Sequence, residues 1–280
     1  MKGQERVLLG AQSLRERLFF YYRKGVAVIA FLALWEVAPR LGLLDRQFIP
    51  PLSEIFVTMG QMWGVGGGKS QGSQMAPLYV HILVSLKRTA LGFFSASAIA
   101  LPLGFLLGGW FKRFEEYLNP LLTLLAKINP FSMFPVFIIL FGIGELTKVV
   151  IILWVSVWPI LFGTINGVRG IDPLLVKAAL AMGTPKLALF WKVVLPGAAP
   201  HIFAGLKQGG GTSFFMLIAA EMIGATAGLG FLVANAQVNF QMRRLFVAVI
   251  IIAILGLLLN WLLERLERRA LIWKEDAPMG

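Results

Sequence analysis

The residues that most enzymes use for chemistry are scarce in this chain. It contains no cysteine and only two histidines, His81 and His201, which lie far apart in the sequence. A cysteine nucleophile, a disulfide and a thiolate metal site are therefore excluded. A metal-dependent enzyme would have to rely almost wholly on the 14 Asp and Glu residues, and these form no cluster with a base or a nucleophile. We therefore predict no catalytic residues and no metal ligands.

One segment, GVGGGKS at 64–70, superficially suggests a phosphate-binding loop. That motif requires a glycine, four residues and then Gly-Lys-Ser/Thr, and counting back from Gly68 places Trp63 at the first glycine position. No strand precedes the segment and no helix clearly follows it. We interpret it as a flexible loop and not as a nucleotide-binding site.

A basic segment at 169–197 carries the signals of a short helix. Asp172 is a favourable N-cap, Pro173 suits the first helical position, and Gly183 suits a left-handed helix end. Apolar residues recur between these positions at helical spacing: Leu174, Leu175, Ala178, Ala179 and Met182.

The same signals then restart. Thr184 is the expected cap and Pro185 the expected first residue of a second short helix, which runs to about Val194 and ends at Leu195-Pro196. A helical hairpin between two apolar stretches is typical of a docking element on a membrane protein.

The composition indicates an integral membrane protein. Of the 280 residues, 58% are hydrophobic without counting glycine, and only 14% are charged. Six stretches meet or nearly meet the roughly 20 apolar residues that a bilayer requires: 25–42, 89–111, 128–144, 149–168, 198–222 and 245–263. The first is expected to be a retained span and not a cleaved signal, because no small-residue cleavage motif follows it.

The distribution of positive charge predicts the orientation. Sixteen of the 26 Lys and Arg residues lie in the two tails and the two loops that six spans place on one face, against eight on the other. The positive-inside rule then places both termini and the hairpin in the cytoplasm. The expected organisation is a cytoplasmic tail at 1–24, a six-span domain at 25–263 with its hairpin at 172–195, and a cytoplasmic tail at 264–280. The net charge of +12 is therefore attributed to the membrane and not to nucleic acid.

Several collinear motifs carry a resemblance to a known family. KAALAMG (177–183), followed after a spacer by Leu-Pro, resembles the cytoplasmic loop of ABC-importer permeases. Further segments resemble the nitrate/sulfonate/taurine group of these permeases over roughly 48–240: FIPPLSEIF (48–56), SLKRTALGFFSASAIALPLGFLLG (85–108), FGIGELTK (141–148), GVRGIDPLL (167–175), LPGAAPHIFAGL (195–206) and AAEMIGATAGLGFL (219–232).

The resemblance implies the fold of a type I ABC importer permease, which is all-α, with six transmembrane helices and a cytoplasmic coupling-helix hairpin. It implies a non-enzymatic subunit of the bacterial inner membrane that works as a homodimer. Its expected partners are two ATPase subunits, which bind ATP and Mg, and an extracytoplasmic solute-binding protein. The expected cargo is a small anion resembling sulfonate, nitrate or taurine, and this chain is expected to hold no cofactor.

The resemblance also assigns the coupling role to the helix at 173–183. The expected ATPase-coupling residues are Asp172, Lys177, Ala178, Ala179 and Gly183. Lys177 stands where the family signature has a glutamate, so the shape of the helix is kept while the acidic contact is not. Lys177 would either pair with an acidic residue of the partner or be solvated, and solvation is favoured because exposed pairs contribute only about 0–1 kcal/mol.

A second set of polar residues is a candidate for the substrate path or a gate: Lys87, Arg88, Ser132, Thr212, Ser213 and Glu221. Lys87 and Arg88 are expected near the outer interface, where they would attract an anion or anchor the helix. Glu221 would act as a gate or pair with Arg243 or Arg244, with pairing favoured. The hydroxyl residues, together with Asn235, would line a polar path or pack helices.

Two other functional classes remain as alternatives. An ion-gradient-driven secondary transporter would need acidic or histidine relays within the membrane, and only Glu36 and Glu221 come near this requirement. A membrane enzyme would need the catalytic cluster that the sequence lacks. Survival of uptake after ATP depletion would favour the secondary transporter.

Overall fold

The computed structural model describes residues 26–63 and 76–271. Within these ranges the regular structure is helical and contains no strand, which confirms the predicted all-α class. The predicted tail at 1–24, the GVGGGKS segment and the end of the C-terminal tail beyond residue 271 lie outside the described residues. The described residues form two compact units, one from 26–63 and 236–247 and the other from 76–235 and 248–271.

In the smaller unit, a helix that covers residues 26–40 is followed by a turn and by α2, Leu52–Trp63. Glu36 accepts hydrogen bonds from both the backbone amide and the hydroxyl of Ser53, at 3.1 and 2.9 Å. The Trp35 indole packs edge-on against Phe246, with ring centroids 5.6 Å apart. Glu36 therefore helps to fix the start of α2.

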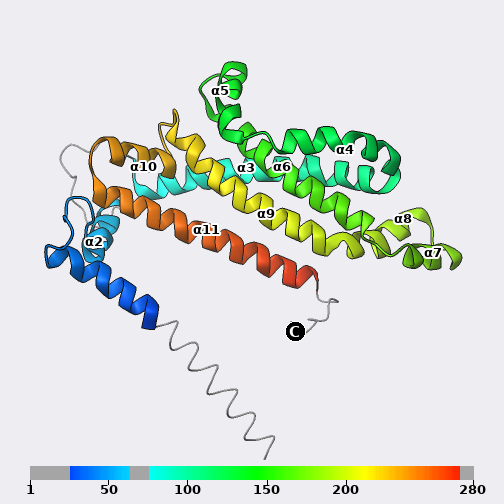
Figure 1. Ribbon diagram of the computed structural model, residues 1–280, viewed down its shortest axis with the longest axis horizontal. Helices are drawn as coiled ribbons and strands as arrows, with labels where there is room; N and C mark the ends of the chain where they lie inside the picture. Colours follow the sequence, from blue (N-terminus) through cyan, green and yellow to red (C-terminus); the bar gives the residue numbers. More distant parts are fainter. Residues whose placement is uncertain (1–25, 64–75, 272–280) are drawn as a thin grey trace, which may run out of the picture. The chain divides into compact units, whose positions relative to one another are not determined.

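The larger unit contains most of the chain's helices (Figure 1). In chain order they are α3 (Leu78–Phe105), the π-helical turn η1 (Leu106–Trp110), α4 (Lys112–Ala126), α5 (Pro130–Phe141), α6 (Glu145–Arg169), α7 (Pro173–Ala181), α8 (Lys186–Leu189), the π-helical turn η2 (Phe190–Val194) and α9 (Leu195–Met222). Two further helices, α10 (Leu229–Val238) and α11 (Met242–Ala270), have residues in both units.

The centre of the larger unit is formed by α6, which packs along both α3 and α9 (Figure 1). Small residues allow this close approach. A Cβ atom on Gly205 would lie 2.7 Å from the Pro159 carbonyl oxygen and 3.3 Å from the Gly163 Cα. Glycine is therefore required where α9 crosses α6, as is common where membrane helices pack backbone to backbone.

Four helical segments are long and apolar enough to cross a bilayer: Leu78–Gly109, Glu145–Arg169, Lys186–Met222 and Met242–Ala270. The shortest has 25 residues, or about 37 Å at 1.5 Å per residue, against a hydrocarbon core of roughly 30 Å. These segments confirm that four of the six predicted stretches lie on long apolar helices. The helix at 26–40 is not among the candidate spans, and only the described residues were searched.

Two predicted spans differ from the structure in their limits. The stretch predicted at 89–111 lies on a helix that begins at Leu78, so Lys87 and Arg88 lie inside the helix and not at its start. The stretch predicted at 128–144 contains only α5, whose 12 residues are too short to cross a bilayer. Together with α4, α5 forms a pair bent by 89° that could account for one broken span. The bend occurs where Asn129 caps α5 and Pro130 begins it.

Candidate functional site

The predicted coupling helix is present as α7, with the predicted start. The Asp172 carboxylate accepts a hydrogen bond of 2.8 Å from the Leu174 amide, and Pro173 occupies the first helical position. This arrangement satisfies one of the amides that a helix start leaves unpaired. The local chemistry of these residues thus fixes where α7 begins.

The end of α7 also follows the prediction. Gly183 has a φ of +77°, and its amide donates to the Leu180 carbonyl while the Thr184 amide donates to the Ala179 carbonyl. These two bonds form a Schellman motif, in which a left-handed glycine closes the helix. Thr184 therefore completes α7, and its predicted role as the cap of the next helix is wrong, because Pro185 occupies that position without a side-chain cap.

The second helix of the hairpin does not end at Leu195-Pro196 as predicted. It continues through the π-helical turn η2 into α9, so that Lys186–Met222 forms one uninterrupted helical segment. Pro196 lies in the first turn of α9, directly after η2, and proline is tolerated in the first turn of an α-helix. The hairpin is consequently continuous with a candidate span.

The hairpin exposes a surface that is largely apolar. Ala179 is buried, whereas Lys177, Ala178 and Gly183 are exposed. Large apolar side chains are also exposed around them: Leu174, Leu175, Leu180, Met182 and Leu187. Lys177 makes no ion pair with any described residue, so both alternatives for it, solvation and pairing with an acidic residue of a partner, stay predictions. An apolar patch on a short projecting hairpin is typical of a protein-binding surface.

An ion pair with one buried partner ties the segment that leads into the hairpin to the rest of the unit. Arg169, the last residue of α6, pairs with the fully buried Glu115 of α4 and donates to the Lys112 carbonyl. Asn119 donates to Glu115 at 2.7 Å, and Thr123 donates to Asn119 at 3.1 Å. The sequence analysis missed this group, although Glu115, Asn119 and Thr123 stand at i, i+4 and i+8, a spacing that places them on one helix face.

A second buried charge cluster surrounds Arg88 at the other end of α6. Its guanidinium makes two 2.6 Å bonds to Glu145, a 2.6 Å bond to Glu221 and a 2.7 Å bond to the Ala227 carbonyl. Lys148 adds a 3.2 Å bond to Glu145. Arg88 and Glu221 are buried, so each requires the other to offset the loss of hydration.

The same cluster holds the segment between α9 and α10. The Gly228 amide donates to His81 Nδ1 at 3.0 Å, the Leu229 amide to Ser85 Oγ at 2.9 Å, and the Gly230 amide to Glu221 at 2.9 Å. Ser85 also donates to Glu221 at 2.8 Å. The predicted pairing of Glu221 with Arg243 or Arg244 is therefore wrong, because Arg88 from α3 reaches Glu221. Arg243 pairs with Glu54 within the smaller unit.

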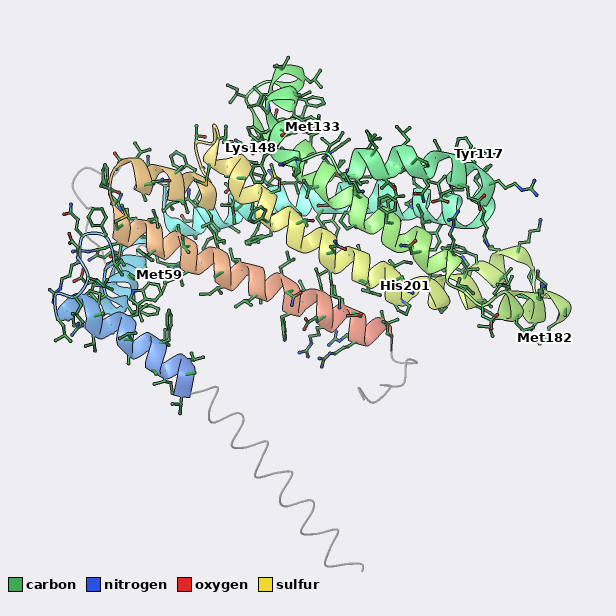
Figure 2. All side chains as sticks on the ribbon, in the orientation of Figure 1. Met59, Tyr117, Met133, Lys148, Met182 and His201 are labelled. Atoms are coloured by element: carbon green, nitrogen blue, oxygen red, sulfur yellow. The ribbon has the colours of Figure 1, made fainter. Side chains whose placement is uncertain are left out.

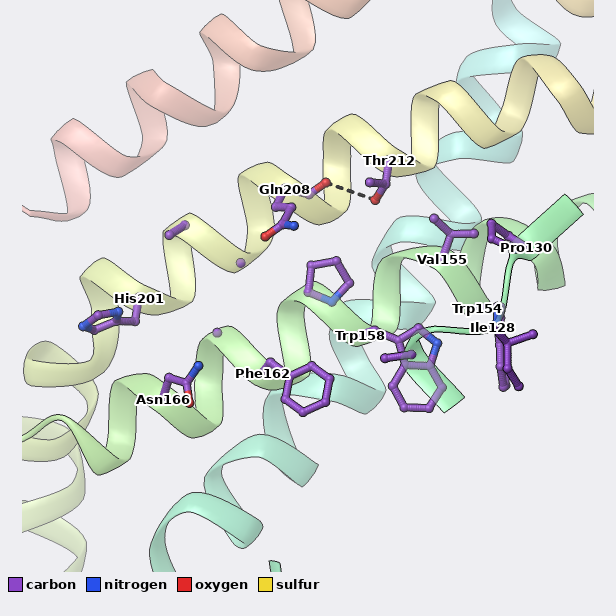
Figure 3. A pocket seen from close by; sticks show the side chains of 15 residues that line it. Ile128, Pro130, Trp154, Val155, Trp158, Phe162, Asn166, His201, Gln208 and Thr212 are labelled. Atoms are coloured by element: carbon purple, nitrogen blue, oxygen red, sulfur yellow. Dashed lines mark hydrogen bonds between the residues drawn. The ribbon is translucent and has the colours of Figure 1, made fainter. Parts of the chain in front are cut away.

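Between the two ends of α6 lies an open groove of about 530 Å³ (Figure 3). Its walls come from α6, α9 and the break between α4 and α5. Asn166, His201, Gln208 and Thr212 contribute polar groups, and Trp154, Trp158 and Phe162 contribute aromatic rings. The groove is concave and mostly apolar with a few polar groups, as ligand sites usually are.

The candidate path residues occupy different environments. Thr212 lines the groove and donates to the Gln208 carbonyl at 3.0 Å. Ser213 is buried and donates to the Gly210 carbonyl, Ser132 is exposed on α5, and Lys87 is exposed on α3. Arg88 and Glu221 lie in the buried cluster. The structure thus brings together Arg88 with Glu221, and leaves Thr212 as the one residue of the candidate set that lines the groove.

Long apolar helices, an exposed apolar hairpin and a groove between helices favour a membrane transport protein. Residues 100–272 match the family of the binding-protein-dependent transport system inner membrane component. The chain belongs to this family, whose members are non-enzymatic membrane subunits of ABC importers and act with a separate ATPase.

Individual relatives agree with this assignment. A Bacillus subtilis protein named as an aliphatic sulfonates transport permease is 30% identical over 91% of this chain and 89% of its own length. The taurine transport system permease protein TauC of Escherichia coli is 31% identical over 86% of each chain. The nitrate import permease protein NrtB of Leptolyngbya laminosa is 31% identical over 73% of this chain and 71% of its own length.

A solved structure shares the fold. A chain of the inward-facing MetNI methionine ABC transporter matches with a TM-score of 0.60 and 21% identity, over 69% of this chain and 95% of its own length. The predicted permease fold is thereby confirmed. Membership of an ATP-driven importer family also replaces the gradient-driven transporter and the membrane enzyme that the sequence alone left open.

Proposed function

We propose that this chain is the permease of an ATP-driven importer for small sulfonate-like anions and that α7 is its coupling helix. Two copies of the chain would form the membrane part. Two ATPase subunits would bind ATP and Mg and would each hold one α7, and a solute-binding protein would deliver the cargo.

The coupling role is supported most directly by the exposed apolar side chains of α7 and by the continuity of the hairpin with α9. Helix α7 exposes Leu174, Leu175 and Met182 to a partner, while the end of α6 that leads into it is fixed by the pair of Arg169 with Glu115. Met182 lies at the far end of the unit from Lys148, which belongs to the Arg88 cluster (Figure 2). A partner that moves the hairpin would therefore move α6 and α9 as well, since η2 joins α8 to α9 without a break.

The orientation and the cargo rest on the sequence and on the relatives. The excess of Lys and Arg in the two tails and on the face of the hairpin supports a cytoplasmic position for all three. The relatives named for sulfonate, taurine and nitrate import share small oxyanions as their cargo, and this supports the same class here.

The experiment is co-purification. A tagged copy, co-expressed with its neighbouring genes and extracted in mild detergent, is expected to retain an ATPase at two copies per two copies of this chain. A stable particle that contains no nucleotide-binding partner under conditions that preserve the dimer would contradict the proposal.

A further inference from the structure

The smaller unit contains an open pocket of about 370 Å³ whose lining is basic and polar. Arg46, Arg243 and Arg244 line this arginine pocket, and no Asp or Glu is among its described lining residues. Arg46 comes from the turn before α2, and the other two arginines belong to the first turn of α11. The remaining polar side chains of the lining are uncharged: Gln47, Thr58, Gln61 and Gln241.

The three arginines are held in place by the chain itself. Arg46 donates to two backbone carbonyls at 3.1 and 3.4 Å, and Arg244 donates to a glutamine of the pocket at 2.9 Å. Arg243 pairs with Glu54 at 2.8 Å, yet its side chain is 63% exposed. Asp45 accepts from a backbone amide and is not a lining residue. Since Glu54 offsets one of three positive charges, the pocket is suited to a phosphate, whose oxygens match the planar fork of a guanidinium.

The pocket lies at the end of a candidate membrane span. The charge-free stretch 245–263 of α11 has roughly the 20 residues that the hydrocarbon core of a bilayer requires. Arg243 and Arg244 come directly before this stretch. When α11 crosses the bilayer, these two arginines therefore lie at the level of the lipid headgroups.

The surroundings of Arg46 are apolar and exposed. In the turn between the helix at 26–40 and α2, large apolar side chains stand on both sides of Arg46 in the sequence, and all are exposed: Leu41, Leu43, Leu44 and Phe48. Such a group is unfavourable in water but is accommodated where a protein meets lipid. An arginine among them places a positive charge at that boundary.

Phe240 adds a strained aromatic residue to the lining of the pocket. Its φ of +53° lies in the left-handed region, and its ring is 69% exposed. The Gln241 amide donates to the Ala236 carbonyl, and the Phe240 amide donates to the Gln237 carbonyl, so Phe240 occupies the glycine position of a Schellman motif. An exposed ring gains little from folding, and strain of this kind is typical of functional sites.

We propose that the arginine pocket binds the headgroup of an anionic glycerophospholipid and that it prefers phosphatidylglycerol. The arginines bind the phosphate oxygens, and the amides and the hydroxyl of the lining bind the glycerol hydroxyls. Phe240 and the exposed apolar turn contact the acyl chains. Phosphatidylethanolamine is disfavoured, because its ammonium group meets the positive charge of the arginines. The proposal depends neither on the cargo nor on the coupling role of α7.

The test is native mass spectrometry of the purified, delipidated full-length chain in detergent. Dioctanoyl phosphatidylglycerol, dioctanoyl phosphatidylethanolamine and glycerol 1-phosphate are titrated separately. Phosphatidylglycerol is expected to saturate at one molecule per chain, with an affinity at least about tenfold above that for phosphatidylethanolamine, because hydrogen bonds between charged groups are the stronger ones. Glycerol 1-phosphate is expected not to saturate over the same range, since it has no acyl chains to bury.

Three substitutions test the pocket. Arg46→Gln removes a charge, and Arg46→Lys keeps the charge but loses the planar fork, so both should weaken phosphatidylglycerol binding by at least about tenfold. Gln61→Glu leaves the arginines in place and adds a carboxylate that repels the phosphate, with an expected loss of similar size. Arg113→Gln, at an exposed arginine of α4, is the control and should bind as the unmodified chain does. Thermal unfolding shows that each variant is folded.

Four outcomes would overturn the proposal. Equal binding of the two phospholipids would show that the headgroup is not recognised, and equal binding of glycerol 1-phosphate would point to a soluble phosphate ester. Unchanged binding in Arg46→Lys and Gln61→Glu would leave only general surface charge. An Arg46→Gln chain that binds phosphatidylglycerol normally but loses the co-expressed solute-binding protein would assign the pocket to protein docking.

Discussion

Arg88 and Glu221, separated by 133 residues in the sequence, form a 2.6 Å ion pair in which the Arg88 side chain is 4% exposed and that of Glu221 is 0% exposed. The pair joins α3 to α9 at one end of the larger unit. The Ala227 carbonyl and the Gly230 amide bond to the same two side chains. One ion pair thus fixes two helices and the segment that leads into α10.

Removal of one member of this pair should be strongly destabilising. Arg88→Met leaves Glu221 as an uncompensated buried charge and should cost roughly 3–5 kcal/mol. The double variant Arg88→Met/Glu221→Met should cost clearly less than the sum of the two single variants. Thermal unfolding in detergent measures all three, and Lys87→Met, at the exposed neighbouring position, serves as the control. Additive losses would show that the two residues do not depend on each other.

Arg169 should transmit motion from the hairpin to the rest of the unit. Arg169→Met removes the bond to Glu115 that fixes the end of α6 to α4. We expect this variant to bind its ATPase but to lose most of the coupling between ATP hydrolysis and transport. The measurement is the number of ATP molecules hydrolysed per cargo molecule imported in proteoliposomes. Arg113→Met, a change at an exposed residue of α4, should keep the ratio of the unmodified protein, and an unchanged ratio in Arg169→Met would contradict this role.

Gly205 should tolerate no side chain. The Cβ of Gly205→Ala would lie 2.7 Å from the Pro159 carbonyl oxygen, which belongs to the backbone of α6 and cannot move alone. Separation of α9 from α6 should lower the unfolding temperature by several degrees, in keeping with overpacking costs of about 1–3 kcal/mol. Gly211→Ala is the matched control, because its Cβ would meet nothing within 4 Å. Equal stability of the two variants would show that the contact is not a close one.

Asp172 should act through its side-chain oxygen. Asp172→Ala removes the bond to the Leu174 amide and should destabilise the start of α7 by about 1 kcal/mol, which corresponds to about fivefold weaker ATPase binding if the helix must be formed to bind. Asp172→Ser supplies another capping oxygen and should restore most of the affinity. If alanine and serine have the same effect, the cap is not what matters at this position.

The features that the sequence predicted well are those that depend on neighbouring residues. Asp172, Pro173 and Gly183 define α7 because caps and left-handed glycines act within one helical turn. The Arg88 cluster could not be found in this way, because its members are brought together by the packing of α3 against α6 and α9. The predicted span began at residue 89, because a charged residue such as Arg88 lowers the apolar count. The sequence does not reveal that Glu145 and Glu221 offset this charge inside the fold.

The break between α4 and α5 and the continuation past Leu195-Pro196 show a second limit. Prolines signal an interruption in both places, but Pro130 begins a new helix after a bend of 89°, whereas Pro196 lies in the first turn of α9 directly after η2. The outcome depends on whether the preceding turn widens to accommodate the proline ring, which is decided by tertiary packing.

The most direct test of α7 as the coupling helix is the ATPase content of purified complexes with substitutions at Gly183. Its φ of +77° is readily adopted by glycine and asparagine but is strained for a β-branched residue. Gly183→Asn should retain the ATPase and transport. Gly183→Val should insert into the membrane normally yet lose both. A Gly183→Val complex with its full ATPase content and with unchanged uptake would contradict the account.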